Sequence, residues 1–302
     1  MGGVLSARNA IVGPQMPANP ANRILYQTFG GLSFANRVTG STNMWADFAG
    51  TDAISGQTYP ITASLWGGTT PNIPSLQCIG SDPLNDQTRQ IITAPGPYGG
   101  NEPVLQLGVV NPYNASVTTQ NSFVWYAASG VPSGMVYFRR WLKQGAGFAA
   151  NMAGGKFYAV CETKTTPSTG RPNIGISSYS GAPQWSVSSE YYANGTTYTN
   201  YFTDLLSTSQ VPLPTPNVWF LFEAAWRYAP DSSGWIWMAH NGAQVYFRAG
   251  QNQPAAIASE KINRIFPYLL YTSMTRPYTE QHARIEVWNA WPTNASPHPD
   301  VS

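Results

Sequence analysis

The residues best suited to chemistry in this sequence are aromatic and charged side chains that alternate along short apolar segments. In segment 135–143, a period of two places Tyr137, Arg139 and Trp141 on one face and mostly apolar residues on the other. Aromatic rings beside hydrogen-bonding groups suit sugars, which offer apolar C–H faces as well as hydroxyls. The spacing therefore favours a carbohydrate-binding surface, although solubility alone explains the polar groups equally well.

Two further segments are expected to form strands beside segment 135–143 and to complete the surface that carries Tyr137, Arg139 and Trp141. Segment 217–228 alternates in the same way, with Glu223 and Arg227 opposite an inward row of Phe, Ala and Trp residues. Segment 235–240 is followed by Asn241-Gly242 and a second strand-like run, which is the strongest short-range signal of a β-hairpin.

The composition points to many strands joined by turns. Aromatic residues make up 13% of the 302 residues, and there are 28 Gly and 25 Pro. Aromatics favour half-buried strand surfaces, whereas Gly and Pro form turns. No segment has the periodicity of a long helix. The sequence therefore predicts an all-β fold, an antiparallel jelly-roll sandwich with long loops, formed as a single domain by residues 23–302.

Residues 1–22 carry Pro14, Pro17 and Pro20 in a polar setting, which predicts an extended N-terminal arm. Such an arm can be held by a neighbouring subunit, so a protein partner is expected there. The N-terminus lacks the apolar stretch of a signal peptide, and no segment is apolar enough to span a membrane. We expect a protein on the extracellular or virion surface that leaves its cell by another route.

Charge and cysteine usage exclude several classes of site. Only 10% of the residues are charged, against roughly 25% in an average soluble domain, and no basic cluster is present, so nucleic acid is not an expected partner. Cys78 and Cys161 are far apart and favour two buried free thiols over one disulfide. Asp82 and Asp86 in one loop are weak evidence for calcium, and no cofactor is expected.

The segment from Trp219 to Phe247, with its Gly-Trp-Ile-Trp run and Asn-Gly hairpin, resembles the back half of the concanavalin A-like lectin/glucanase superfamily. Segments 137–143 and 156–158 are similar to concave strands of its polysaccharide-lyase members, and segment 284–289 is similar to its terminal strand. The resemblance implies a concave sheet on which sugars lie. The residues that it implies for this surface are Tyr137, Arg139, Trp141, Tyr158, Glu162, Glu223, Arg227, Trp235 and Trp237.

Each of these residues also has a purely structural explanation. A Trp in a strand is more often part of the core than of a binding surface. Arg139 with Glu162, or Arg227 with Glu223, would form ion pairs that offset the cost of burying a charge.

Known catalytic patterns are mostly absent. The β-glucanase members of the superfamily carry Glu-x-Asp-x-x-Glu on one strand, which this chain lacks. Glu162 and Glu223, expected on adjacent strands, are the remaining candidate pair for a retaining glycosidase. No Gly-x-Ser-x-Gly and no phosphate-binding Gly-rich loop occurs.

A polysaccharide lyase needs a Tyr, His or Lys base together with a group that neutralises a uronate carboxylate. The side chains that would supply both are Tyr137, Arg139, Lys143 and Tyr158. His240 falls on the face opposite Trp235 and Trp237, and His282 and His298 are expected to be structural.

We therefore expect a non-catalytic, lectin-like protein that binds a polysaccharide or cell-surface glycan. A phage virion decoration or adhesion protein would fit the low charge and the extended arm. The alternative is a polysaccharide lyase acting on a uronate-containing polymer, and a third reading is a sandwich that binds only protein neighbours.

Overall fold

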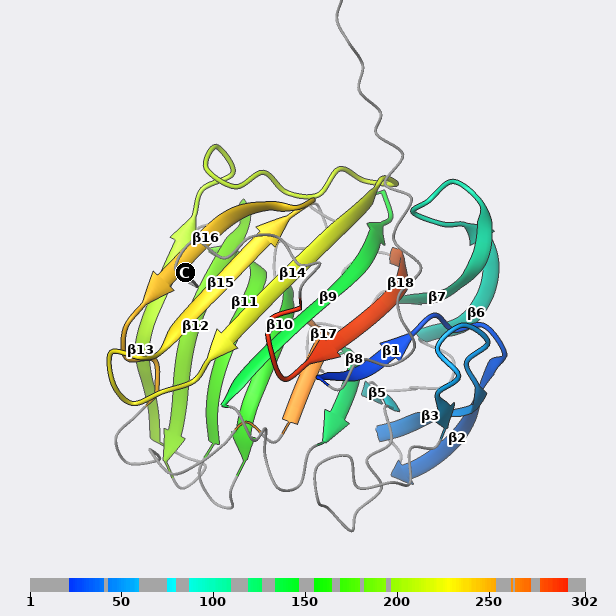
Figure 1. The fold of residues 1–302 in the computed structure, drawn as a ribbon, viewed down its shortest axis with the longest axis horizontal. Coiled ribbons are helices and arrows are strands. Elements are labelled where there is room, and N and C mark those ends of the chain that lie inside the picture. The colour runs from blue at the N-terminus through cyan, green and yellow to red at the C-terminus, as the bar shows by residue number, and fades with distance from the viewer. Residues whose placement is uncertain are drawn as a thin grey trace, which may run out of the picture.

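The computed structural model describes residues 22–40, 43–59, 75–79, 87–109, 119–126, 134–146, 155–164, 169–179, 182–193, 197–253, 262, 264–272 and 278–292. Within these ranges there is no helix, and most residues lie in strands. The strands form two sheets that pack face to face (Figure 1). The predicted all-β sandwich is confirmed.

The front sheet, which faces the viewer in Figure 1, has eight strands. These are β1 (Arg23–Gln27), β6 (Gln87–Pro95), β7 (Asn101–Val109), β9 (Met135–Gln144), β14 (Trp219–Arg227), β15 (Trp235–His240), β16 (Ala243–Ala249) and β18 (Tyr278–Trp288). Their order is β16-β15-β14-β9-β18-β7-β6, and β1 pairs with the second half of β18. All pairs are antiparallel.

The back sheet has ten strands in the order β13-β12-β11-β10-β17-β8-β5-β3-β2, with β4 paired to β3. Their bounds are β2 (Leu32–Gly40), β3 (Asn43–Thr51), β4 (Thr58–Tyr59), β5 (Ser75–Ile79), β8 (Thr119–Tyr126), β10 (Gly155–Lys164), β11 (Thr169–Tyr179), β12 (Ala182–Ala193), β13 (Thr197–Leu206) and β17 (Arg264–Thr272). These strands also pair antiparallel throughout.

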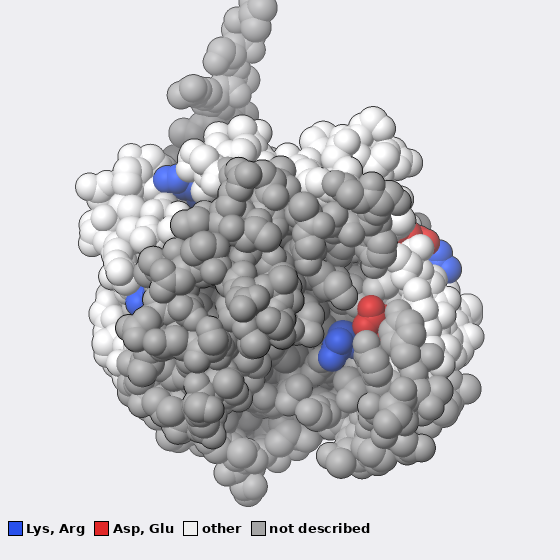
Figure 2. Space-filling model, turned by 180° about the vertical axis from the view of Figure 1, so that it is seen from behind, with Lys and Arg blue, Asp and Glu red and all other residues white. Residues whose placement is uncertain are grey.

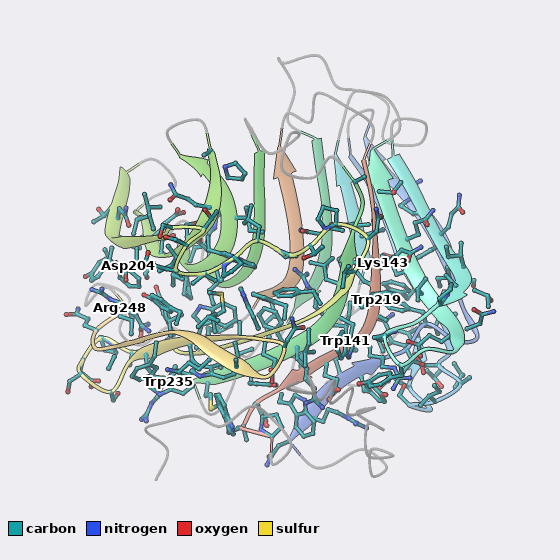
Figure 3. The ribbon with its side chains drawn as sticks, turned by 90° about the horizontal axis from the view of Figure 1, so that it is seen from above. Trp141, Lys143, Asp204, Trp219, Trp235 and Arg248 are labelled. Atoms are coloured by element: carbon teal, nitrogen blue, oxygen red, sulfur yellow. The ribbon has the colours of Figure 1, made fainter. Side chains whose placement is uncertain are left out.

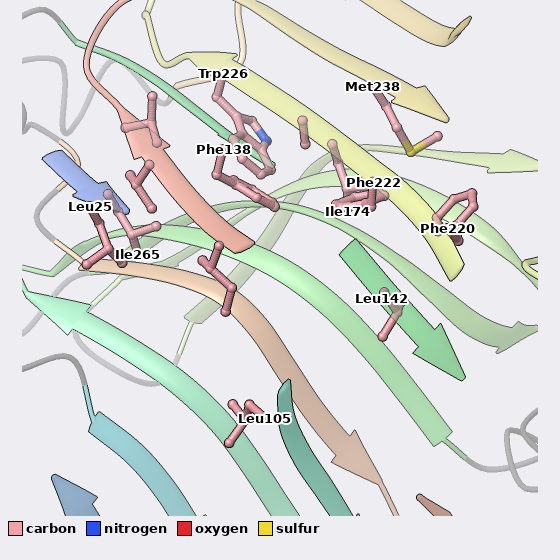
Figure 4. Close-up of a cluster of buried hydrophobic side chains, with 14 of the residues drawn as sticks. Leu25, Leu105, Phe138, Leu142, Ile174, Phe220, Phe222, Trp226, Met238 and Ile265 are labelled. Carbon is pink, nitrogen blue, oxygen red and sulfur yellow. The ribbon is translucent and has the colours of Figure 1, made fainter. Parts of the chain in front are cut away.

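The core lies between the sheets and follows from strand alternation. Phe222 and Trp226 of β14 point inward from the front sheet, as predicted, and Phe222 meets Trp185 of β12 from the back sheet. The Trp185 and Phe222 rings are stacked, with centroids 5.6 Å apart and an interplanar angle of 3°. Phe138 stacks on Trp226 at 5.2 Å. Figure 4 shows these apolar side chains filling the space between the layers.

Two turns fix the chain where strands meet. Asn241 and Gly242, with φ of 50° and 84°, form the predicted hairpin turn between β15 and β16. Asp52, at the end of β3, is fully buried and accepts five hydrogen bonds from the backbone and hydroxyl of Thr28 and from the backbone of Phe29, Ile54 and Ser55. This carboxylate ties the end of β1 to the loop that follows β3.

The topology settles the disulfide question. Cys78 lies on β5 and Cys161 on β10, and β8 and β17 separate these strands within the back sheet. Three inter-strand spacings amount to about 14 Å between the backbones, whereas a disulfide needs Cα atoms within about 7 Å. The two cysteines therefore do not bond to each other.

Some sequence-based predictions fall outside the described residues. The N-terminal arm, over residues 1–21, is among them. None of the described residues belongs to a helix that could cross a membrane.

Candidate functional site

The residues predicted for one sugar-binding surface are divided between the two sheets. Seven of them lie on β9, β14 and β15 of the front sheet, whereas Tyr158 and Glu162 lie on β10 of the back sheet. The prediction that Glu162 and Glu223 occupy adjacent strands is therefore wrong, and so is the proposed pairing of Arg139 with Glu162. The error arose because segments close in sequence were assigned to the same sheet, although β9 and β10 belong to different layers.

The outer face of the front sheet, on the side away from the core, carries a second hydrophobic cluster. Tyr137 and Trp237 are fully buried in it, with ring centroids 6.2 Å apart. Trp291 follows β18 and packs edge-on against both rings, at 5.2 and 4.7 Å. Trp235 is half-buried and also contacts Trp291. Of the predicted residues, Tyr137 and Trp237 are thus covered, and their rings are not available to a ligand.

Tyr137 and Glu223 form a buried hydrogen bond in this cluster. The Tyr137 hydroxyl donates to Glu223 Oε1 at 2.6 Å, and Glu223 is only 1% exposed. Burial and the adjacent Glu223 carboxylate raise the pKa of Tyr137 well above its usual value. A general base needs a pKa near the working pH, so this tyrosine is unsuited to proton abstraction.

The carboxylate that binds Arg139 lies on β18, which flanks β9 on the side away from β14. Arg139 Nε donates to Glu286 Oε1 at 3.0 Å, and the other oxygen of Glu286 accepts from Trp288 Nε1 at 3.1 Å. Burial lowers the pKa of the Arg139 guanidinium, but the charges of Glu286 and Tyr137 outweigh it and raise that pKa overall. Sequence reasoning missed Glu286 as the partner because it is 147 residues away along the chain.

The remaining predicted residues of the front sheet are more accessible. Arg227 is exposed and lies opposite Trp235 in the β14–β15 register. Trp141 is half-buried, and its indole Nε1 donates to the Tyr98 hydroxyl at 3.1 Å. Figure 3 shows Trp141 at one end of this face, near Lys143 and Trp219, and Trp235 at the other end.

The outer face of the back sheet carries a row of polar side chains that sequence reasoning did not select. On β11 and β12, Ile174, Ile176, Trp185 and Val187 belong to the core, so the intervening residues lie on the outer face. The register brings Arg171 opposite Glu190, Asn173 opposite Ser188 and Gly175 opposite Ser186. Strand β13 continues the row with Asn200 and Thr203.

Hydrogen bonds connect this polar row. Ser188 Oγ donates to Asn173 Oδ1 at 2.9 Å, and Asn200 Nδ2 donates to Thr203 Oγ1 at 2.6 Å. Asn173, Ser186 and Ser188 are only 4%, 2% and 5% exposed, although they lie on the face opposite the core. Arg171 and Glu190 form a partly exposed ion pair at 3.8 Å. The view from behind shows one basic and one acidic side chain in contact near its middle (Figure 2).

The backbone register places two predicted residues on the strand next to this row. In the pairing of β10 with β11, Tyr158 lies opposite Gly175, and Val160 lies opposite Asn173. On its other side β10 pairs with β17, where Glu162 lies opposite Arg264. The alternating pattern of polar residues in segment 169–190 could have identified the row, because it repeats with a period of two.

The histidines of the described strands lie in the interior. His240 points into the core, where its ring is 4.5 Å from that of Trp185, and burial lowers its pKa to about 3. His282 is fully buried, its Nε2 is 2.9 Å from Glu280 Oε1, and burial lowers its pKa. The prediction that His240 lies opposite Trp235 and Trp237 is confirmed, and His298 lies outside the described residues.

No group of three or more His, Cys, Asp or Glu that could hold a metal occurs among the described residues. Asp82 and Asp86, the weak calcium candidates, lie outside these residues.

Comparison with known proteins gives no sequence match and only distant structural matches. No protein-family model matches the chain, and no curated protein sequence matches it. An endo-β-1,4-glucuronan lyase from Trichoderma reesei has a TM-score of 0.45 and 9% identity over 68% of this chain and 89% of that one. The alginate lyase Aly36B has a TM-score of 0.38 and 8% identity, and the match covers 65% of this chain and 82% of that one. The binding domain of botulinum neurotoxin serotype D/C has a TM-score of 0.39 and 10% identity, and the match spans 75% of this chain and 48% of that one.

All three solved structures are 8 to 10% identical to this chain and have TM-scores below 0.5.

Proposed function

We propose that this chain binds carbohydrate along the polar row on the outer face of the back sheet. The observation that carries the proposal is the accessible part of the row, where the register brings together the partly exposed Arg171, Glu190 and Thr203 and the exposed Asn200. Asn173 and Ser188 are almost fully buried beside them and satisfy each other by a hydrogen bond.

The chemistry of the row suits a polyol. Asn200 is exposed and Thr203 is half-buried, and together they offer an amide and a hydroxyl to a ligand. At the end of the row, Arg171 offers planar paired donors and Glu190 offers acceptors. Neighbouring donors and acceptors of this kind match the vicinal hydroxyls of a sugar ring.

Affinity electrophoresis and calorimetry against a panel of neutral and acidic polysaccharides test the proposal. Arg171→Gln and Glu190→Gln should each weaken binding by about tenfold, the equivalent of one to two lost hydrogen bonds. Ser33→Ala, an exposed serine on β2, is the matched control and should bind as the unmodified protein does. Full affinity in both site variants, with folding intact, would refute the proposal.

A lyase is the second candidate function, and the register of β10 favours placing it on the same face. Tyr158 lies one strand from Asn173 and Arg171, which are the types of residue that neutralise a uronate carboxylate. Incubation with alginate, pectin and glycosaminoglycans should then produce the ultraviolet absorbance of unsaturated uronates. Tyr158→Phe should abolish this signal, whereas Tyr137→Phe should not. No new absorbance with any polymer would leave the non-catalytic binding function.

A place on a virion or outside the cell, as a decoration or adhesion protein, is part of the same proposal. It is supported by the low charge of the sequence. Mass spectrometry of purified particles and of the culture medium tests it, and exclusive recovery from the cell interior would contradict it.

A further inference from the structure

We propose that the outer face of the front sheet holds a second, independent glycan site at the end where β6 joins β7, with a preference for acidic saccharides. The site is the aromatic patch formed by Tyr98, Trp141, Trp219, Lys143 and Arg284. It lies on the opposite side of the sandwich from the polar row, and its residues come from β9, β14, β18 and the turn after β6.

The strands bring three of these side chains together directly. Trp219 of β14 lies opposite Lys143 of β9, and the next pair on this face is Leu221 with Trp141. Diagonal neighbours on one sheet face are about 7–8 Å apart, within reach of large rings. Figure 3 shows Trp141, Lys143 and Trp219 grouped at the same end of the front sheet.

A glycine-rich turn adds the third ring. Gly99 has φ of 91° and Gly96 N donates to Gly100 O at 2.8 Å, which closes the turn between β6 and β7. Tyr98 in this turn is 40% exposed, and its ring lies edge-on to that of Trp141 at 5.6 Å.

Hydrogen bonds hold the rings in position before any ligand arrives. Trp141 Nε1 donates to the Tyr98 hydroxyl at 3.1 Å, and Trp219 Nε1 donates to the carbonyl of Pro95 at 2.9 Å. Because both indole N–H groups are satisfied within the protein, the remaining accessible surface of the rings is apolar. Rigid, partly exposed rings lose little conformational entropy on binding.

Two cations border the rings and give the patch its preference for negative charge. Arg284 lies over the Tyr98 ring, with Cζ 4.1 Å from the centroid, and its charge is paired with Glu102 at 2.7 Å. Lys143 lies over Trp219 with Nζ 5.7 Å from the centroid. In the described part of the chain Lys143 has no ion-pair partner, so the patch keeps a net positive charge.

This combination suits one class of ligand. An acidic saccharide offers an apolar C–H face for Trp141 and a carboxylate or sulfate group for Lys143. A neutral saccharide offers only the first, and a simple anion only the second.

Calorimetry with oligogalacturonate and with its methyl ester, at low and at moderate salt, tests the proposal on the full chain. Lys143→Gln keeps most of the side chain and should weaken oligogalacturonate binding by about tenfold at low salt, with little effect on the ester. Trp141→Ala should weaken binding of both ligands at this patch. Val218→Ala, an exposed residue beside Trp219, is the matched control and should change neither.

The outcomes separate this site from the polar row. If both sites exist, Glu190→Gln weakens one class of binding event and Lys143→Gln weakens the other. Loss of binding only in Lys143→Gln and Trp141→Ala would uphold the aromatic patch and refute the polar row. One result would overturn the aromatic patch. In that result, Lys143→Gln binds oligogalacturonate and its methyl ester with equal affinity, both affinities match those of the unmodified protein, and neither depends on salt. Because Lys143→Gln removes no hydrogen bond of the fold, this result stands even if Trp141→Ala fails to fold.

Discussion

At the scale of single residues, the structure changes the role of the side chains that looked most chemical. The sequence made Tyr137 a candidate base of a lyase and Glu223 a candidate carboxylate of a glycosidase. In the folded chain they satisfy each other in a covered cluster. The polar residues that remain on outer faces without serving a core are smaller and less conspicuous, such as Asn173 and Ser188.

Tyr137→Phe should destabilise the protein by about 1–3 kcal/mol, because it leaves the buried Glu223 carboxylate without a hydrogen bond from the phenol. It should not change carbohydrate binding or any lyase activity. Urea unfolding, with Tyr201→Phe at an exposed tyrosine as the control, measures the effect. A loss of activity without a loss of stability would restore Tyr137 as a functional residue.

His240 should make the protein less stable in acid. Its pKa falls from 6.5 in the unfolded chain to about 3 in the folded protein because of burial. The unfolded chain therefore binds more protons between these pH values, and stability falls as the pH drops through that window. The free energy of unfolding falls by up to roughly 5 kcal/mol once the pH reaches the pKa of the folded protein, about 3.

Unfolding free energies measured between neutral pH and the lower limit of this window should show a flatter pH dependence for His240→Leu than for the unmodified protein. His282 is buried beside Glu280 and also has a lowered pKa, so some dependence should remain. Parallel curves for the two proteins would show that His240 does not contribute.

At the scale of elements, predicted strands and observed strands agree best in the front sheet. The runs around Tyr137, Phe222 and Trp235 alternate strictly, and each forms a strand close to its expected bounds. Strands β11, β12 and β13 were not predicted. Their sequences are rich in Ser, Thr, Asn and Gly, which also favour turns, so the apolar positions that face the core are less evident.

Asp52→Ala should destabilise the junction of β1 with β3 by about 3 kcal/mol or more, since five hydrogen bonds lose their acceptor. The same substitution at Asp231, which caps an exposed turn through Ser233, is the control and should cost less than about 1 kcal/mol. Chemical denaturation compares the two variants. Equal effects would show that the buried hydrogen bonds of Asp52 are replaced by water.

At the scale of the whole molecule, the two sheets present different chemistry to solvent. The front sheet carries partly exposed rings and cations at one end (Figure 3). The outer face of the back sheet carries a largely buried hydrogen-bonding row that ends in the partly exposed Arg171 and Glu190. Trp185, Phe222 and His240 join the sheets through the core. Both proposed sites therefore depend on one shared core, and stability must be measured beside binding for every variant.

The positions of Cys78 and Cys161 give a prediction for the intact chain. Both should react with a thiol reagent in denaturant, two per chain, whether or not a reductant was added first. The unmodified protein and a Cys78→Ser variant should also unfold in the same way under oxidising and reducing conditions. A mass lower by two hydrogens before reduction would show a disulfide and contradict the strand order.

By itself, the sequence determined what is local: the strand alternation, the Asn-Gly hairpin, the inward row of β14 and the all-β class. These features follow from a period of two and from turn chemistry within a few residues. The tertiary structure alone decided which strands share a sheet. It thereby paired Arg139 with Glu286, covered Tyr137 and Trp237, and moved Tyr158 and Glu162 to the other layer. Such pairings join residues far apart in the sequence, 147 positions in the case of Arg139 and Glu286, so no local pattern encodes them.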